Sequence, residues 1–271
     1  MLLSFVIATT LAGANPQAAE IQLYTGAQVD GSATKIAAWG GGTIKEDHAN
    51  AFRNGHSLQI TTTSMFNGGL VSFGSPVKLA SMVSNPENML SATFYIVGNT
   101  DAGNTKKNIE NIRMLIRTSD GKLSEAVLPV GLGYNRWKPL GIPLNKVSGF
   151  SKTNMEISSI SFGADAPGMI YVGEVRAVND KSSIQGRTEK MTMTMARDQE
   201  TLFVGAAEAG STICEYVWDW DAKDGLQEDA IGQAVYHRFR VGGDYVVTLT
   251  VRDKYGVKKP WTGTIKVTVW Q

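Results

Sequence analysis

Cysteine and histidine are scarce in this chain. Its 271 residues contain one cysteine, Cys214, and three histidines. A single cysteine cannot form an intrachain disulfide bond, and one thiolate cannot build a cysteine-based metal cluster. Free cysteine is usually a small buried residue, and we favour this interpretation for Cys214, with an intermolecular disulfide bond as the alternative.

An excess of charge of one sign is also missing. The chain has 26 lysine and arginine residues against 25 aspartate and glutamate residues, which gives a net charge of +1. Neither residues 1–185 nor residues 186–271 concentrate the basic side chains. Nucleic-acid binding needs a cluster of cations that neutralises phosphates, so we expect no nucleic-acid partner.

Long apolar runs are missing except at the start of the chain. Residues 1–14 read MLLSFVIATTLAGA, a run too short to remain as an anchor across a bilayer. Its length and the small residues Ala12 and Ala14 are typical of a secretory signal peptide, although no lysine or arginine precedes it. We expect residues 1–19 to be a signal peptide cleaved after Ala14 or Ala19, no membrane span, and a secreted or cell-surface protein. The alternative is an N-terminal strand or helix of a cytosolic protein.

Motifs for catalysis are missing as well. The chain contains no Gly-x-Ser-x-Gly elbow and no His-Glu-x-x-His zinc motif. Gly40-Gly41-Gly42 is not followed by Lys-Ser/Thr, so it is no phosphate loop. Glu46, Asp47 and Glu174 could serve as an acid–base pair, but nothing in the sequence places them across a cleft. We predict that the chain is not an enzyme and keep a small hydrolase as an alternative.

What the sequence does contain is strand periodicity. Leu58 and Ile60 alternate with polar residues, which predicts a strand with one buried face. Asp120-Gly121 separates two apolar runs, and glycine accepts the positive φ of a tight hairpin turn. With 29 glycines, these patterns predict an all-β protein. We expect strands at residues 57–63, 91–97, 109–117, 122–130, 137–143, 156–162, 169–178, 191–196, 201–206, 213–219, 244–253 and 262–269.

These strands divide into two groups. Residues 179–187 are small and polar, which is typical of a domain boundary. We therefore predict two β-sandwich domains, one at residues 20–180 and one at residues 187–271. The two domains show no internal repeat.

The second domain carries the most specific motif. Tyr216, Trp218 and Trp220 occupy every second position, so in a strand they share one face, which we expect to be the inward face. Residues 243–253 alternate in the same way and place Tyr245, Val247, Leu249 and Val251 on one face. Together with Asp219, Phe239, Asp253 and Gly256, these residues resemble the polycystic kidney disease (PKD) repeat over about residues 187–271.

The resemblance implies an Ig-like sandwich that acts as a spacer or interaction module in secreted proteins. The chain departs from the family at the tight turn, where the six residues 220–225 replace the family's Phe-Gly-Asp-Gly and predict a longer loop. Asp219, Asp221 and Asp224 could hold structural calcium, but they lack EF-hand spacing, and aspartate commonly caps turns. We predict no metal site and no cofactor, with structural calcium as the alternative.

The first domain resembles galactose-binding-like jelly rolls, the fold of many carbohydrate-binding modules. Four segments carry this resemblance: residues 54–60, 136–144, 157–162 and 168–175. The family's last strand usually carries an aspartate pair that here is Gly173 and Glu174, so we expect no calcium ligand at that end.

Aromatic rings are the candidate ligand contacts, because sugars present apolar C–H faces on which rings stack. We predict Trp39, Tyr134 and Trp137 as ligand-binding residues. Trp39 ranks first because its neighbours Gly40-Gly41-Gly42 leave the ring approachable. The competing interpretation for each is core packing, since tryptophan and tyrosine are mostly buried.

The predicted function is a secreted binding module that contacts a polysaccharide or a surface protein, with the PKD-like domain as spacer. The alternative is a self-assembling structural subunit of an extracellular fibre, surface layer or matrix. Exposed aromatic side chains around Trp39 would favour the first, and open apolar strand edges would favour the second.

Overall fold

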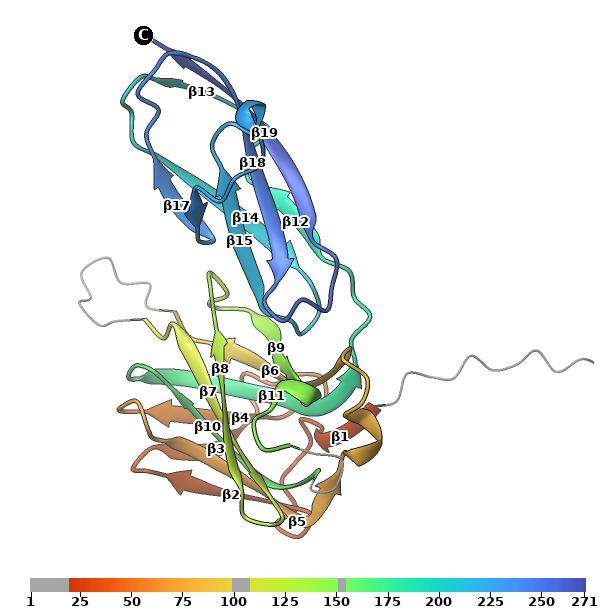
Figure 1. Ribbon diagram of the computed structural model, residues 1–271. Coiled ribbons are helices and arrows are strands. Elements are labelled where there is room, and N and C mark those ends of the chain that lie inside the picture. Colours follow the sequence, from red (N-terminus) through yellow and green to blue (C-terminus); the bar gives the residue numbers. More distant parts are fainter. Residues whose placement is uncertain (1–19, 99–107, 151–154) are drawn as a thin grey trace, which may run out of the picture.

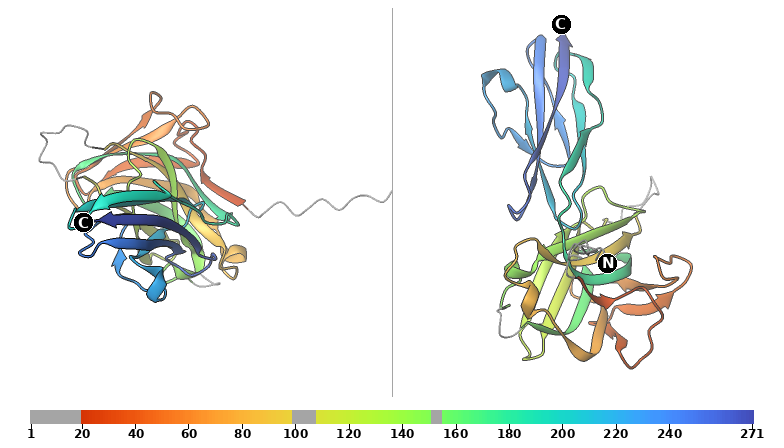
Figure 2. Two further views of the ribbon diagram at one scale, coloured as in Figure 1. Left: turned by 90° about the horizontal axis from the view of Figure 1, so that it is seen from above. Right: turned by 90° about the vertical axis from the view of Figure 1, so that its right-hand side faces the viewer.

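The computed structural model describes residues 20–98, 108–150 and 155–271. The predicted signal peptide at residues 1–19 and most of the polar segment 99–108 lie outside these ranges. The described chain folds into strands, with three short 3-10 helices between them. Figure 1 shows two bodies of β-structure, and Figure 2 shows that the C-terminus lies at the end of the second body that is far from the first.

The first body is a sandwich of two antiparallel sheets. Sheet 1 has the order β3-β4-β11-β6-β9, with β1 paired to the second half of β11, and sheet 2 has the order β2-β5-β10-β7-β8. The strands of sheet 1 are β1 Glu20–Tyr24, β3 Thr43–Asp47, β4 Ser57–Thr62, β6 Asn88–Ile96, β9 Trp137–Pro143 and β11 Gly168–Asn179. Those of sheet 2 are β2 Thr34–Trp39, β5 Gly68–Lys78, β7 Asn111–Thr118, β8 Leu123–Pro129 and β10 Glu156–Ala164.

The strand order makes this sandwich a jelly roll. From β4 to β11, the chain places β4, β11, β6 and β9 side by side in one sheet and β5, β10, β7 and β8 in the other. This is the eight-strand double Greek key of the jelly roll, and β2 and β3 extend its sheets at one side. The predicted jelly roll is therefore confirmed.

Inward-facing side chains of both sheets form the first core. Phe94 of β6 and Phe162 of β10 meet edge to face with ring centroids 5.8 Å apart, and both rings are fully buried. Alternation along each strand sends every second residue into this core. The predicted hairpin at Asp120-Gly121 joins β7 to β8, and Gly121 has a φ of +85°.

The second body is an Ig-like sandwich of eight strands. Sheet 3 has the order β12-β14-β17, and sheet 4 has the order β13-β19-β18-β15-β16. The strands are β12 Gln185–Thr188, β13 Thr192–Ala196, β14 Thr201–Glu208, β15 Cys214–Asp219, β16 Ala230–Ile231, β17 Ala234–His237, β18 Gly243–Asp253 and β19 Trp261–Trp270. The strand β13 runs parallel to β19, and the other pairs are antiparallel.

Aromatic rings fill the second core as the alternation predicted. Trp218 is fully buried, Tyr216 is buried, and Trp220 stacks on Trp218 with ring centroids 5.9 Å apart. Val247, Leu249 and Val251 of β18 face these rings, and Tyr245 packs at their margin. Cys214 is a free thiol that is only partly buried beside this core, so the expectation of a fully buried cysteine is wrong.

An ion pair, a hydrogen bond and an apolar contact join the two sandwiches. At the end of β11, Asp180 forms an ion pair with Lys258 of the second sandwich, with 3.1 Å between the Asp180 Oδ1 and Lys258 Nζ atoms and both side chains at least 92% buried. Ser91 of β6 and Ser211 share a hydrogen bond of 2.7 Å. Ile213 of the second sandwich packs into the core of the first.

Candidate functional site

Trp39 lies on the outer face of sheet 2. It ends β2 in register with Gly68 of β5, and Gly68 is in register with Gly163 of β10. A β-carbon placed at Gly163 would lie 3.0 Å from the Cζ3 atom of the Trp39 ring. The absence of a side chain at Gly163 therefore lets the ring lie close against the sheet.

A tight turn presents this ring. Gly40 and Gly41 have φ angles of +58° and +89°, and the Gly42 amide donates to the Trp39 carbonyl at 3.1 Å. Positive φ at both central positions is the mirror-image turn that glycine permits. A β-carbon at Gly40 would lie 2.4 Å from the Phe66 carbonyl oxygen, so the turn packs tightly against the backbone at Phe66.

Phe66 and Arg113 extend the aromatic surface. The Phe66 side chain is exposed, with 57% of its surface accessible, and the Arg113 guanidinium carbon lies 4.3 Å from the centroid of its ring. Arg113 is on β7 in register with Gly163, and it forms an ion pair with Glu125 of β8. We call Trp39, Phe66, Arg113 and Glu125 the Trp39 platform.

The chemistry of the platform combines flat apolar rings with fixed polar groups. The cation–π contact and the ion pair hold the Arg113 guanidinium in place, and its donors form a planar fork. The Glu125 carboxylate accepts hydrogen bonds. Such a surface can stack on an apolar ring face and bond hydroxyl groups at its rim.

Tyr134 lies elsewhere and is partly buried. Its hydroxyl donates to the Ile109 carbonyl at 2.8 Å, and its ring packs on the first core. Burial, with the nearby charges of Glu110 and Asp165, raises the pKa of the Tyr134 hydroxyl. The fold therefore uses both the ring and the hydroxyl, and a ligand contact by Tyr134 stays a prediction.

Trp137 lies on the outer face of sheet 1, the opposite side of the sandwich from Trp39. Its ring centroid is 5.7 Å from that of Tyr95 on β6 and 4.9 Å from that of Phe52. Tyr95 in turn meets Tyr171 of β11 edge to face at 5.9 Å. Trp137 thus belongs to a separate aromatic cluster, and its role in binding also stays a prediction.

The structure does not bring the three predicted residues together. It adds Phe66 and Arg113 to Trp39, and the sequence reasoning missed both. Phe66 follows Met65 in a Ser-Thr-Asn-rich stretch, and two adjacent apolar residues in such a loop were the available signal for an exposed pair. Arg113 alternates with Ile112 and Met114, which marks it as outward-facing on its strand.

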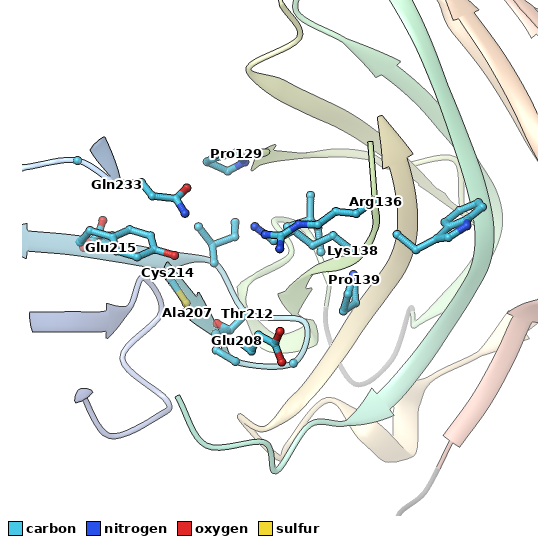
Figure 3. Close-up of a pocket in the computed structure, with 18 of the residues that line it drawn as sticks. Pro129, Arg136, Lys138, Pro139, Ala207, Glu208, Thr212, Cys214, Glu215 and Gln233 are labelled. Carbon is cyan, nitrogen blue, oxygen red and sulfur yellow. The ribbon is translucent and has the colours of Figure 1, made fainter. Parts of the chain in front are cut away.

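A cleft opens between the two sandwiches beside β9. It has a volume of about 600 Å³ and is lined by residues of both bodies, with Arg136 and Lys138 on one side and Cys214, Glu215 and Gln233 on the other. Figure 3 shows these side chains converging from the two bodies.

In the described parts of the chain, no group of three or more histidine, cysteine, aspartate or glutamate residues is placed to hold a metal ion. Asp219 accepts hydrogen bonds from the amides of Asp221 and Gln227, and Asp221 accepts from the amide of Lys223. Asp219 and Asp221 therefore order the longer turn after β15. No helix among the described residues is long and apolar enough to cross a membrane.

The chain was compared with curated proteins, with solved structures and with models of protein families. No curated protein matches the chain. Among solved structures, the chain is similar to a β-1,2-glucanase from Parabacteroides distasonis, with a TM-score of 0.38 and 14% identity over 92% of this chain and 38% of that one. It is also similar to a carbohydrate-binding module of the β-sandwich superfamily, with a TM-score of 0.35 and 12% identity over 57% of this chain and 60% of that one.

The chain thus spans less than two thirds of either of these structures. The family model of the PKD domain matches residues 187–269. This range holds the whole aromatic core of the second sandwich, including Trp218 and Leu249. The C-terminal sandwich of this chain is a PKD domain.

Proposed function

We propose that this chain is a secreted, non-catalytic binding protein whose first sandwich binds carbohydrate on the Trp39 platform. In this proposal, residues 1–19 are a cleaved signal peptide, residues 20–180 are the binding domain, and residues 187–271 are a spacer domain. The observation that carries the proposal is the Trp39 ring lying close against Gly163 on the outer face of sheet 2, next to the turn that packs on the exposed Phe66.

The placement of the platform supports a polymer as ligand. Trp39, Gly163 and Arg113 lie in one row across four adjacent strands of sheet 2. Neighbouring strands are about 4.8 Å apart, so the row extends over roughly 14 Å. A row of this length contacts several sugar units of a chain that crosses the strands.

The platform also faces away from the PKD domain. The PKD domain contacts sheet 1 through Ser91 of β6 and Gly141 of β9, which accepts a hydrogen bond of 3.5 Å from the Tyr255 hydroxyl. Sheet 2 is the opposite layer of the sandwich. A polymer can therefore run along sheet 2 without meeting the second domain.

A glycan pull-down of Trp39→Ala tests the proposal. The wild-type protein is mixed with a panel of insoluble polysaccharides, and we expect binding to at least one of them that Trp39→Ala loses by tenfold or more. Sugar–aromatic stacking acts through ring area, so Phe66→Ala should weaken the same binding. Trp270→Ala is the matched control, because Trp270 is 57% exposed on β19 of the other domain.

Binding that survives Trp39→Ala would place the glycan elsewhere. An absence of binding across the whole panel would refute the carbohydrate function. Both results are interpretable only if circular dichroism shows that the variants keep the wild-type fold.

Self-assembly is the second candidate function, and one observation favours it. Tyr236 of β17 and Leu202 of β14 are in register on neighbouring strands of sheet 3, and their side chains are 66% and 41% exposed. The strand β17 is the last of its sheet, and such an edge can accept a strand from a neighbour. Light scattering over a concentration series checks this: oligomers that Tyr236→Lys dissolves would support assembly, and a monomer at all concentrations would exclude it.

A further inference from the structure

The interdomain cleft has a mostly apolar wall with two cations on one side. Pro139 and Leu140 of β9 line it from the first sandwich, and Ile213 and Ile231 line it from the PKD domain. Its volume of about 600 Å³ is within the range of small-ligand sites in proteins. It is larger than a single ion needs and suits a molecule with one apolar face.

Arg136 and Lys138 carry the positive charge. They precede and follow Trp137 at the start of β9, and Figure 3 shows both side chains extending from this strand toward the PKD domain. Arg136 is exposed at the mouth of the cleft, and Lys138 lies deeper. The Lys138 ammonium donates one long hydrogen bond of 3.4 Å to the Val130 carbonyl.

Neither cation is paired within the described part of the chain. No carboxylate there lies within 4.0 Å of the Arg136 guanidinium or the Lys138 ammonium. Burial, together with the charge of Arg136, lowers the pKa of Lys138. A partly buried cation such as Lys138 loses hydration without gaining a counter-ion, and an anion from outside would offset that loss.

The carboxylates of the cleft do not supply this counter-ion. Glu215 is bound by Arg252, with 3.0 Å between the Glu215 Oε2 and Arg252 Nε atoms. Glu208 is exposed, and Figure 3 shows its carboxylate apart from the Arg136 and Lys138 head groups. Gln233 is occupied too: it donates to the Gly205 carbonyl and accepts from the Leu132 amide, which fixes one end of the cleft.

We propose that the interdomain cleft is a second binding site, which holds an acidic saccharide by its carboxylate or sulfate group between Lys138 and Arg136. The sugar ring lies against the apolar wall formed by Pro139 and Ile231. This site is distinct from the Trp39 platform, and it would add selectivity for charged glycans to the binding that the platform provides.

Cys214 provides a local readout, because its thiol lines the same cleft and is the chain's one cysteine. The experiment measures the rate of Cys214 alkylation by a maleimide, with and without a trimer of galacturonic acid. A sulfated trisaccharide and a neutral galactose trimer are the second and third probes. Calorimetry on the same samples gives the affinities at low salt.

We expect the acidic probe to slow alkylation and the neutral probe to leave the rate unchanged. Lys138→Met should weaken acidic binding by about tenfold or more, since charge-assisted hydrogen bonds are the strong ones. Burial raises the pKa of the Cys214 thiol and the charge of Lys138 opposes that rise, so rates are compared as ratios within each variant. Lys78→Met is the control, because the Lys78 side chain is 81% exposed on the first sandwich.

The outcomes separate this site from the platform. Protection by the galacturonate or by the sulfated probe identifies which anion the cleft prefers, and Trp39→Ala should retain it. Equal alkylation rates with all three probes, or equal affinities for Lys138→Met and Lys78→Met, would overturn the proposal. If Trp39→Ala loses glycan pull-down but acidic probes still protect Cys214, the result supports two independent binding sites.

Discussion

The ion pair between Asp180 and Lys258 is the feature whose removal should be most informative. Lys258→Ala deletes the cation and leaves the Asp180 carboxylate, which is 94% buried, without its counter-charge. It also removes the hydrogen bonds that the Lys258 ammonium donates to the carbonyls of Asp180 and Ser182. The two sandwiches then lose a polar contact at their junction.

The size of the effect follows from what Asp180 keeps. Removal of one partner of a buried ion pair costs about 3–5 kcal/mol. Asp180 still accepts hydrogen bonds from the amides of Ser182 and Ser211, at 3.1 and 2.7 Å. These two bonds place the expected loss at the lower end, about 3 kcal/mol, which is roughly 6–12 °C in the thermal midpoint of a chain of this size.

Differential scanning calorimetry measures this shift. Lys259→Ala is the matched control, because Lys259 is the next residue and is exposed. Surface substitutions of this kind change stability by about 0.5 kcal/mol or less. The reasoning is refuted if Lys258→Ala and Lys259→Ala unfold at the same temperature, since the buried pair would then contribute nothing to the junction.

Three further predictions follow from single residues. Trp218→Ala should cost about 3–5 kcal/mol in urea unfolding, because the ring is fully buried and its indole nitrogen donates to the Gly232 carbonyl; a smaller loss than that of an exposed Trp270→Ala would contradict this. Gly163→Leu should displace the Trp39 ring and abolish glycan pull-down, whereas wild-type binding in this variant would show that the position of the ring against the sheet is not needed. Burial opposes ionisation of Asp180, but hydrogen bonds from Ser211 and Ser182 and the charge of Lys258 outweigh burial and lower the pKa of Asp180 below 3.8. The ionised carboxylate therefore stabilises the fold fully above pH 3.8, and this stabilisation is lost as the pH falls through the lower pKa of the folded state. The urea midpoint of the wild type should fall further between about pH 5 and about pH 3 than that of Asp180→Asn.

Much of the fold was predictable because alternation is a local property. Residues 137–143 were predicted as a strand and form β9 with the same bounds. Leu58 and Ile60 are fully buried as the period of two required. The PKD domain was predictable for the same reason, since Tyr216, Trp218 and Leu249 repeat at fixed spacing within two strands.

The strands that were missed have weak or interrupted alternation. Residues 68–78 form β5, which lies between β2 and β10 in sheet 2. They contain three glycines and a proline, a composition that is typical of a loop. Only pairing with β2 and β10 makes them a strand, and such long-range pairing is not visible locally. Trp39 belongs to the equally weak strand β2. Its partial accessibility could be guessed from Gly40-Gly41-Gly42, but its neighbours could not.

The candidate site was less predictable than the fold. Trp39 and Phe66 are 27 positions apart, and Arg113 comes from a third segment. Their meeting depends on the order of strands in sheet 2, which periodicity does not encode. The interdomain cleft was hidden more deeply, because Arg136 and Lys138 face the PKD domain and no sequence pattern relates the two bodies.

The jelly-roll order has a consequence for the synthesis of the chain. The strands β10 and β11 lie inside their sheets and contact neighbours on both sides, yet they are the last strands of the first sandwich to leave the ribosome. Until residues 156–179 emerge, β11 is not there to join β4 to β6, and β10 is not there to join β5 to β7. Nascent chains in this state expose apolar surface and open edges, and they close slowly because the missing contacts are distant in sequence. A ribosome stalled before residue 156 should therefore hold a chain that a chaperone binds, and one stalled well after residue 179 should hold a closed sandwich.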